Sequence, residues 1–276
     1  MMTQANEHLR EIVKRYCGHL PTEIANLTSL LEALSKNEGD RNEALDKFHH
    51  EVHRMAGAAQ CMGFSFLGEQ LGKIEESLDV VIERFPIGFD SSALKIADRL
   101  RSVALISSQV LPQNSRLLRP DLNGSAPGVV KTPTKVTGFR EQLAEESILF
   151  ADDDRSVRML MRDILVSLGV SHVETVASGQ EALEAFKTFP ASLVITDWRM
   201  KPVSGLDLLR LIRAGDTELE FDCPVIFLTS YKTVKDVNLV VGEGASHFLV
   251  KPFSGKTVER AILQVLQRSK AEEVFL

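Results

Sequence analysis

The stretch ILFADDD at residues 148–154 decides the fold of the second half of this chain, because a short apolar run there ends in three carboxylates. Three later runs have the same form: LVITDW at 193–198, VIFLTS at 225–230 and FLVKPF at 248–253. Each reads as a buried β-strand, and amphipathic helical stretches separate them. Alternating strands and helices predict a doubly wound α/β domain, in which helices cover both faces of a parallel sheet.

Polar residues end or follow each of these predicted strands. In doubly wound sheets, ligands bind beyond the carboxyl ends of the strands, where the strand order reverses. The residues expected to meet there are Asp152, Asp153, Asp197, Thr229 and Lys251. Crowded carboxylates attract a hard cation such as Mg2+, and a lysine opposite them suits a phosphoryl group. The sequence therefore predicts a site for a divalent cation and a phosphoryl group.

With these motifs in this order and at this spacing, residues from about 147 to about 270 resemble the receiver domain of bacterial response regulators. The resemblance implies a five-stranded parallel sheet of the flavodoxin-like type. It implies that Asp197 accepts a phosphoryl group and forms an acyl phosphate. It also implies that Mg2+ is bound by Asp153, Asp197 and the backbone carbonyl of Arg199, with Asp152 binding directly or through water.

The same resemblance gives roles to three further residues. Lys251 would pair with one phosphoryl oxygen, and Thr229 would donate its hydroxyl to another. Phe248 would be the aromatic residue that moves inward with Thr229, although a core aromatic without any switching role remains an alternative. In DWRMKPVSG at 197–205, Lys201 stands where the family usually has proline, but the length to Gly205 is unchanged. We therefore expect this loop to close.

Residues before about 110 have no strand pattern, and their apolar residues recur at steps of three and four. Four such stripes are separated by KNEGD at 36–40, CMGF at 61–64 and PIGFDSS at 86–92. This pattern predicts an all-α, antiparallel four-helix bundle, with residues 5–18 as an additional helix.

The second of these predicted helices contains His53, and Gly57 follows one turn later. Glycine costs about 1 kcal/mol inside a helix relative to alanine, so we interpret it as leaving room for a partner to approach the imidazole. The segments HRMAGAAQCMGF at 53–64 and LGEQLGKIEESL at 67–78 resemble histidine phosphotransfer (HPt) domains. The resemblance implies that His53 accepts a phosphoryl group. Ala56 replaces a lysine that is common in the family, and Arg54 is expected to supply the positive charge instead.

Two other interpretations of this histidine remain. A helical histidine is often a packing or surface residue. Asp46, His49 and His53 also share one helix face at ligand spacing, which would suit zinc, although no thiol or fourth ligand lies nearby in the sequence.

The chain as a whole is therefore expected to contain a helical domain at 1–111, a flexible linker at 112–143 and a receiver domain at 144–276. Three cysteines without motif spacing, and apolar runs too short to span a membrane, favour the cytoplasm. A net charge of −6 argues against nucleic-acid binding.

These features predict a two-component phosphorelay protein that accepts phosphoryl groups on Asp197 and His53 and passes them between partners. The expected partners are sensor histidine kinases and other receiver or HPt proteins. Because the sequence lacks a glycine-rich nucleotide loop, we expect a phosphotransfer intermediate, not an ATP-using kinase. The alternative is a phosphorylation-switched receiver whose helical half is only an adaptor or a dimerisation module. The resemblance also allows a homodimer through the receiver's fourth helix, fifth strand and fifth helix.

Overall fold

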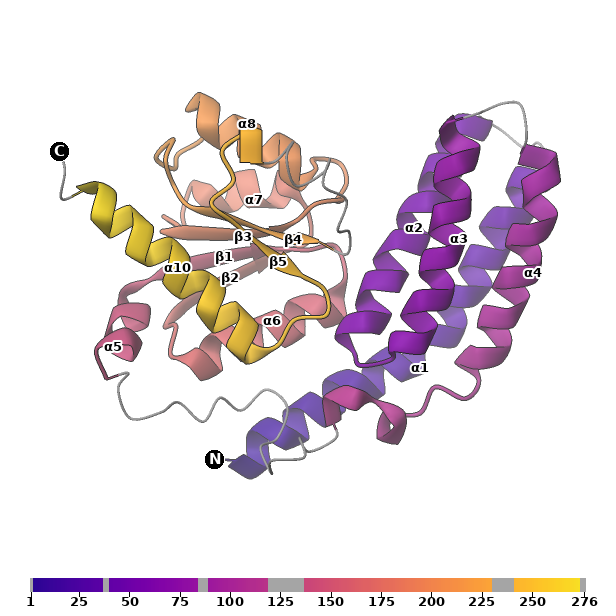
Figure 1. Ribbon diagram of the computed structural model, residues 1–276, viewed down its shortest axis with the longest axis horizontal. Helices are drawn as coiled ribbons and strands as arrows, with labels where there is room; N and C mark the ends of the chain where they lie inside the picture. The colour runs from indigo at the N-terminus through magenta and orange to yellow at the C-terminus, as the bar shows by residue number, and fades with distance from the viewer. Residues whose placement is uncertain (1, 37–39, 84–88, 119–136, 230–240, 274–276) are drawn as a thin grey trace. The chain divides into compact units, whose positions relative to one another are not determined.

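The computed structural model describes residues 2–36, 40–83, 89–118, 137–229 and 241–273. The chain divides into two compact units, Met1–Arg119 and Pro120–Leu276. Figure 1 colours the first unit indigo to magenta and the second magenta to yellow.

The first unit contains four long helices: α1 (Met2–Lys36), α2 (Arg41–Cys61), α3 (Ser65–Glu83) and α4 (Phe89–Ser107). Each packs on the next, and α4 returns to contact α1, so the four surround a common core (Figure 1). Residues of the predicted stripes, such as Leu27, Phe48, Leu71 and Ile96, are buried in it. The helices predicted from the apolar stripes are therefore present.

The additional helix expected at residues 5–18 is not separate, because it forms the first part of α1. The apolar stripe continues without a break from Ile12 through Leu20 to Ile24, and all three side chains are buried. Tyr16 stacks on Phe64 with a ring-centroid distance of 5.8 Å. Continuous burial therefore keeps the helix intact, even though it includes Pro21.

Short helical elements lie at both described ends of the predicted linker. Two 3-10 turns, η1 (Pro112–Asn114) and η2 (Arg116–Leu118), follow α4, and α5 (Thr137–Glu145) precedes the sheet. Residues 119–136 lie outside the described residues. The first part of the segment expected as a linker, residues 112–118, belongs to the helical unit by its contacts with α1.

Ser115 helps to hold these 3-10 turns against the turn between α2 and α3. Its side chain is fully buried and donates a hydrogen bond to the carbonyl of Met62 at 2.6 Å. The amide of Arg116 donates to the carbonyl of Gly63 at 3.1 Å. Gly63 has φ +83°, and a Cβ there would lie 2.5 Å from the amide nitrogen of Leu117. The α2–α3 turn therefore needs glycine both for its backbone conformation and for this close approach.

The second unit contains a parallel sheet in the order β2-β1-β3-β4-β5. Its described strands are β1 (Ser147–Ala151), β2 (His172–Val176), β3 (Leu193–Asp197), β4 (Val225–Thr229) and β5 (His247–Val250). The described helices are α6 (Arg155–Leu168), α7 (Gly179–Phe186), α8 (Gly205–Ala214) and α10 (Gly255–Glu273). Figure 1 shows α6 and α10 on one face of the sheet, with α7 and α8 on the other.

This strand order is the flavodoxin-like one, and it confirms the predicted five-stranded, doubly wound sheet. The central strands β3 and β4 are buried along their whole length, as expected for strands that helices cover on both faces. Among the described helices, none is both long enough and apolar enough to cross a membrane.

Candidate functional site

The carboxyl ends of β1, β3, β4 and β5 meet at one edge of the sheet. The register of β1 against β3 sets Asp152 beside Asp197. The amide of Lys251 donates a hydrogen bond to the carbonyl of Thr229 at 2.8 Å. The structure therefore gathers at this edge the acids, the hydroxyl and the lysine that were predicted to meet there.

Lys251 connects two of the carboxylates directly. Its Nζ lies 2.9 Å from Oδ2 of Asp152 and 2.8 Å from Oδ1 of Asp197. All three side chains are buried. A buried charge is tolerated when it is paired and hydrogen-bonded, so the ammonium and the two carboxylates depend on one another.

Negative charge is nevertheless in excess at this edge. Burial raises the pKa of Asp152 from 3.8 to about 8. The ammonium of Lys251 opposes that rise, whereas the neighbouring carboxylates of Asp197, Asp153 and Asp154 add to it. The cluster therefore favours an additional positive charge, either a proton or a cation.

The third acid of the DDD run has a structural role. Asp154 is the N-cap of α6, and its carboxylate accepts from the amides of Ser156 at 2.8 Å and Val157 at 3.1 Å. Its own amide donates to Oδ1 of Asp152 at 2.9 Å. Arg158 on α6 donates from Nη1 to the carbonyl of Asp152 at 2.6 Å. These contacts fix the loop that presents Asp152 and the half-buried Asp153.

The loop after Asp197 closes as expected despite Lys201. The amide of Gly205 donates to the carbonyl of Trp198 at 3.1 Å. A Cβ on Gly205 would lie only 2.1 Å from the carbonyl oxygen of Asp197, so only glycine fits. The peptide bonds Lys201-Pro202 and Lys251-Pro252 are both cis.

Three other predicted residues line the same region. Arg199 is half-buried in the loop after β3. Thr229 is buried at the end of β4. Phe248 on β5 is partly buried and packs against the core cluster, with its ring centroid 6.3 Å from that of Phe227. Trp198 also contacts Phe227, in an edge-on arrangement with a ring-centroid distance of 5.6 Å.

The donors at this edge fit a hard cation. Among the residues that the structure describes, no three His, Cys, Asp or Glu side chains are arranged to hold a metal ion as they stand. Lys251 lies between two of the acids instead. The donors are nevertheless carboxylate and carbonyl oxygens, which Mg2+ prefers, and a cation would neutralise the neighbouring carboxylates that add to the effect of burial on the pKa of Asp152.

His53 lies on α2 in the helical unit, where its ring is paired with an acid of α3. Nδ1 of His53 is 2.7 Å from Oε1 of Glu75, and both side chains are buried. An ionised carboxylate only accepts hydrogen bonds, so with Glu75 ionised this contact requires the proton on Nδ1. Gly57 is buried on α2 one turn further on.

A zinc site at Asp46, His49 and His53 is not formed. Nε2 of His49 lies 2.9 Å from Oδ1 of Asp79, and His53 pairs with Glu75, so each imidazole meets a carboxylate of α3. Within the described part of the chain no group of ligating side chains is arranged around a metal position here.

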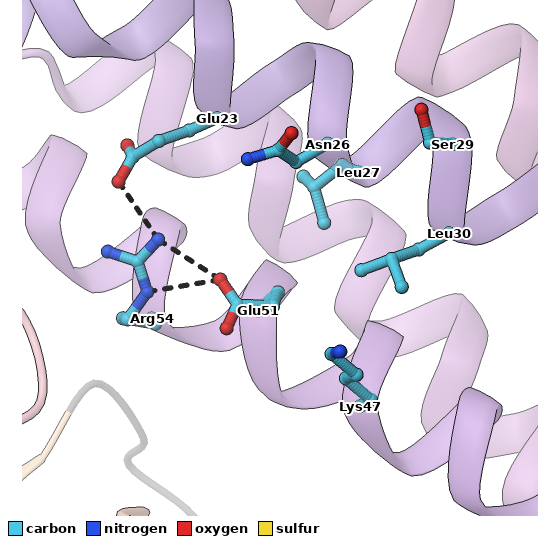
Figure 2. Close-up of a pocket in the computed structure, with 8 residues that line it drawn as sticks. All are labelled: Glu23, Asn26, Leu27, Ser29, Leu30, Lys47, Glu51 and Arg54. Atoms are coloured by element: carbon cyan, nitrogen blue, oxygen red, sulfur yellow. Dashed lines mark hydrogen bonds and ion pairs between the residues drawn. The ribbon is translucent and has the colours of Figure 1, made fainter.

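Arg54 was expected to replace the missing lysine near His53, and Figure 2 shows its surroundings. Its Nη2 lies 2.9 Å from Oε1 of Glu23 and 3.0 Å from Oε2 of Glu51. These residues line a cleft of about 480 Å³ between α1 and α2, together with Lys47 and residues of α1. The guanidinium therefore shares its charge with two carboxylates of this cleft.

Glu75, the pair of His49 with Asp79, and Arg158 were not predicted from the sequence. For the histidines and their acids, the spacing along the two helices could have indicated the pairs. His49 and His53 are four residues apart on one helix, as are Glu75 and Asp79 on the next, and antiparallel helices bring such sets face to face.

The sheet order and the acid–lysine cluster define a doubly wound α/β signalling domain of the receiver class. Residues 148–263 match the family model "Response regulator receiver domain". Chemotaxis protein CheY-3 of Vibrio cholerae is 31% identical over 121 residues, which cover 44% of this chain and 92% of that protein. The chain belongs to the response regulator receiver family, and its receiver domain is a component of two-component signalling.

Two other similarities extend the comparison. The probable transcriptional regulator ycf27 of Cyanidium caldarium is 32% identical over 137 residues, covering 50% of this chain and 53% of that protein. This chain thus spans about half the length of ycf27. The structure of the chemotaxis response regulator CheY4 of Vibrio cholerae has 27% sequence identity and a TM-score of 0.40, covering 44% of this chain and 98% of that one.

Proposed function

We propose that this protein is a phosphorelay component that carries phosphoryl groups on Asp197 and on His53. For Asp197 the observation that supports the proposal is the pair of short contacts from Lys251 to Asp152 and Asp197. They hold the acceptor carboxylate and keep a positive charge beside it. The proposed reaction needs both features, because the transferred group carries negative charge on three oxygens.

In the receiver step, a carboxylate oxygen of Asp197 attacks the phosphorus of a partner's phosphohistidine. The P–N bond breaks, and its electron pair leaves with the imidazole nitrogen. Lys251 pairs with one phosphoryl oxygen, and Thr229 donates its hydroxyl to another. A bound Mg2+ would neutralise the remaining charge. Its ligands would be Asp153, Asp197 and the carbonyl of Arg199, with Asp152 binding directly or through water.

In the histidine step, Nε2 of His53 attacks the phosphorus of a partner's aspartyl phosphate, and the carboxylate leaves with the P–O electron pair. The Nδ1 proton stays on the ring, which becomes positively charged. The observation that supports this step is the 2.7 Å contact between Nδ1 and Glu75, because a buried carboxylate there stabilises that positive charge.

Labelling with acetyl phosphate tests the receiver step. With Mg2+ present, Asp197→Ala should abolish incorporation into the intact chain, whereas His53→Gln should leave it unchanged. Asp216→Ala is the matched control, because Asp216 is an exposed acid away from the strand ends. Labelling of the receiver in Asp197→Ala would show that another residue is the nucleophile.

The chemical stability of the label tests the histidine step. After incubation of Asp197→Ala with a phosphorylated receiver protein, label on His53 should be lost in acid and survive alkali, as a phosphoramidate does. His50→Gln is the control, since His50 is a half-buried neighbour on the same helix. If wild-type His53 takes no label under these conditions, the helical unit is better described as an adaptor or dimerisation module.

Thr229 and Phe248 are proposed to form the switch of the receiver. A ligand shifts an equilibrium only through contacts that it makes better in one state, and the Thr229 hydroxyl and Lys251 are the groups suited to make them. Beryllofluoride with Mg2+ should therefore move Thr229 toward Asp197 and turn Phe248 inward. An NMR spectrum in which β5 and α10 do not respond would contradict this assignment. The expected signalling face spans roughly residues 234–266, and its first part, up to residue 240, lies outside the described residues.

The proposed partners are sensor histidine kinases and other receiver or HPt proteins, in the cytoplasm. Homodimerisation through the same face of the receiver belongs to this proposal. The receiver family supports partners of this kind, because an aspartyl acceptor can take its phosphoryl group from a phosphohistidine donor.

A further inference from the structure

Two histidine–carboxylate pairs are stacked one helical turn apart between α2 and α3. His53 faces Glu75, and His49 faces Asp79, at 2.7 and 2.9 Å. The pairs are also linked to each other, because Nε2 of His49 lies 4.0 Å from Oε1 of Glu75, the oxygen that meets His53. The four side chains therefore form a continuous series, Asp79–His49–Glu75–His53.

Glu75 is the member of this series whose charge is hardest to maintain. It is 2% exposed, so its carboxylate has lost most of its contact with water. A neutral imidazole supplies a hydrogen bond but no compensating charge. His49 can supply that charge, and Asp79 is placed to stabilise its protonated form. The charges of Asp79, protonated His49 and Glu75 then alternate, so each buried charge has an opposite charge beside it.

We propose that His49, held by Asp79, is a positioning residue for His53 and acts through Glu75. It keeps Oε1 of Glu75 directed at Nδ1 of His53, so Nδ1 retains its proton and Nε2 remains the nitrogen that attacks phosphorus. The consequence for transfer rests on the proposed phosphotransfer at His53, but the state of the ring is measurable without any transfer.

The test uses the full-length chain labelled with 15N in its histidine rings. In wild type, the His53 ring should be in the Nδ1–H form. In His49→Gln it should change toward a mixture of the two neutral tautomers, and transfer from a phosphorylated receiver to His53 should slow by on the order of tenfold, as when an outer partner of a ligating histidine is lost. His50→Gln, on the same helix, should change neither quantity.

Asp79→Asn is a second variant that avoids a buried substitution, because the Asp79 side chain is 41% exposed. It keeps the shape of the side chain and removes the charge that stabilises protonated His49, so it should change the His53 spectrum in the same direction as His49→Gln. If both variants leave the His53 tautomer and the transfer rate as they are in His50→Gln, the proposal is wrong. A wild-type chain that takes no label on His53 would instead contradict the proposed relay, and the ring spectra would still decide the role of His49.

Discussion

Lys251 is the single residue on which the buried charge of the receiver most depends, since its ammonium contacts both Asp152 and Asp197. Removing one partner of a buried ion pair leaves the others uncompensated, which costs about 3 to 5 kcal/mol. We expect Lys251→Met to destabilise the metal-free receiver by about 3 kcal/mol, because the buried carboxylate of Asp197 loses the ammonium that compensates it.

Amide exchange of β3 in the intact chain measures this change without separating the two units. Lys187→Met is the control: Lys187 pairs with Glu184 on the surface, at 2.7 Å, and its removal should leave the exchange of β3 unaltered. Equal protection in Lys251→Met and Lys187→Met would mean that the ion pairs of Lys251 do not stabilise the sheet.

The raised pKa of Asp152 predicts how stability varies with pH. With a value of about 8 in the folded state against 3.8 as the ordinary value, the folded receiver holds a proton that the unfolded chain has released. Stability should therefore be higher near pH 5 and fall as the pH rises toward 8. Thermal unfolding without divalent cations should show this fall in wild type and a flatter profile in Asp152→Asn. A wild-type profile that rises over the same range would contradict the assignment.

At the scale of elements, apolar runs and their terminal residues were enough to predict β1, β3 and β4, because central parallel strands are buried on both faces and read as continuous hydrophobic segments. The edge strand β5 is less buried, but the apolar run before Lys251 predicted it as well. The edge strand β2, with the sequence HVETV, alternates polar and apolar residues and was not named from the residues. The positions of the receiver acids and Lys251 were predictable once the strands were, because these residues stand at or directly after the strand ends. The role of Glu75 was not predictable, because α3 contains several acids and only its packing against α2 shows which of them meets His53.

Alanine substitutions at Gly63, in the α2–α3 turn, and at Gly72, within α3, should have opposite effects on stability. Gly63→Ala should destabilise the helical unit and release the turns around Ser115, because Gly63 has φ +83° and a Cβ would meet the backbone at Leu117. Gly72→Ala is the matched control: it lies within α3, a Cβ there meets nothing within 4 Å, and alanine should stabilise the helix by up to about 1 kcal/mol. Urea unfolding followed by helical circular dichroism compares the two. Similar midpoints for both variants would show that residues 115–117 do not restrain the turn.

At the scale of the whole molecule, His53 and Asp197 belong to different compact units of one chain. The segment 119–136 can extend to at most about 65 Å, so the covalent connection permits the two residues to meet. Transfer also needs the imidazole nitrogen in line with phosphorus and the carboxylate, and reach alone does not provide that geometry. We therefore expect transfer within one chain to be slower than exchange with a separate partner protein.

Single-turnover transfer tests this expectation. The wild-type chain is compared at several concentrations with a mixture of His53→Gln and Asp197→Ala chains, in which only transfer between molecules is available. A wild-type rate that is fast and independent of concentration, while the mixture stays slow, would show that the two residues serve each other within one chain.

Trp198 follows Asp197, the proposed acceptor, directly and is the one tryptophan in the sequence. Its indole contacts Phe227, which in turn lies beside Phe248, so it adjoins both the acid cluster and the aromatic residue of the proposed switch. Ultraviolet excitation of the whole chain therefore yields emission from a single indole at the functional edge of the sheet. Cation binding, acyl phosphate formation and partner binding, as proposed, would each change the electric field at that ring. The protein thus contains its own optical reporter, and these events can be timed on the unlabelled, full-length molecule.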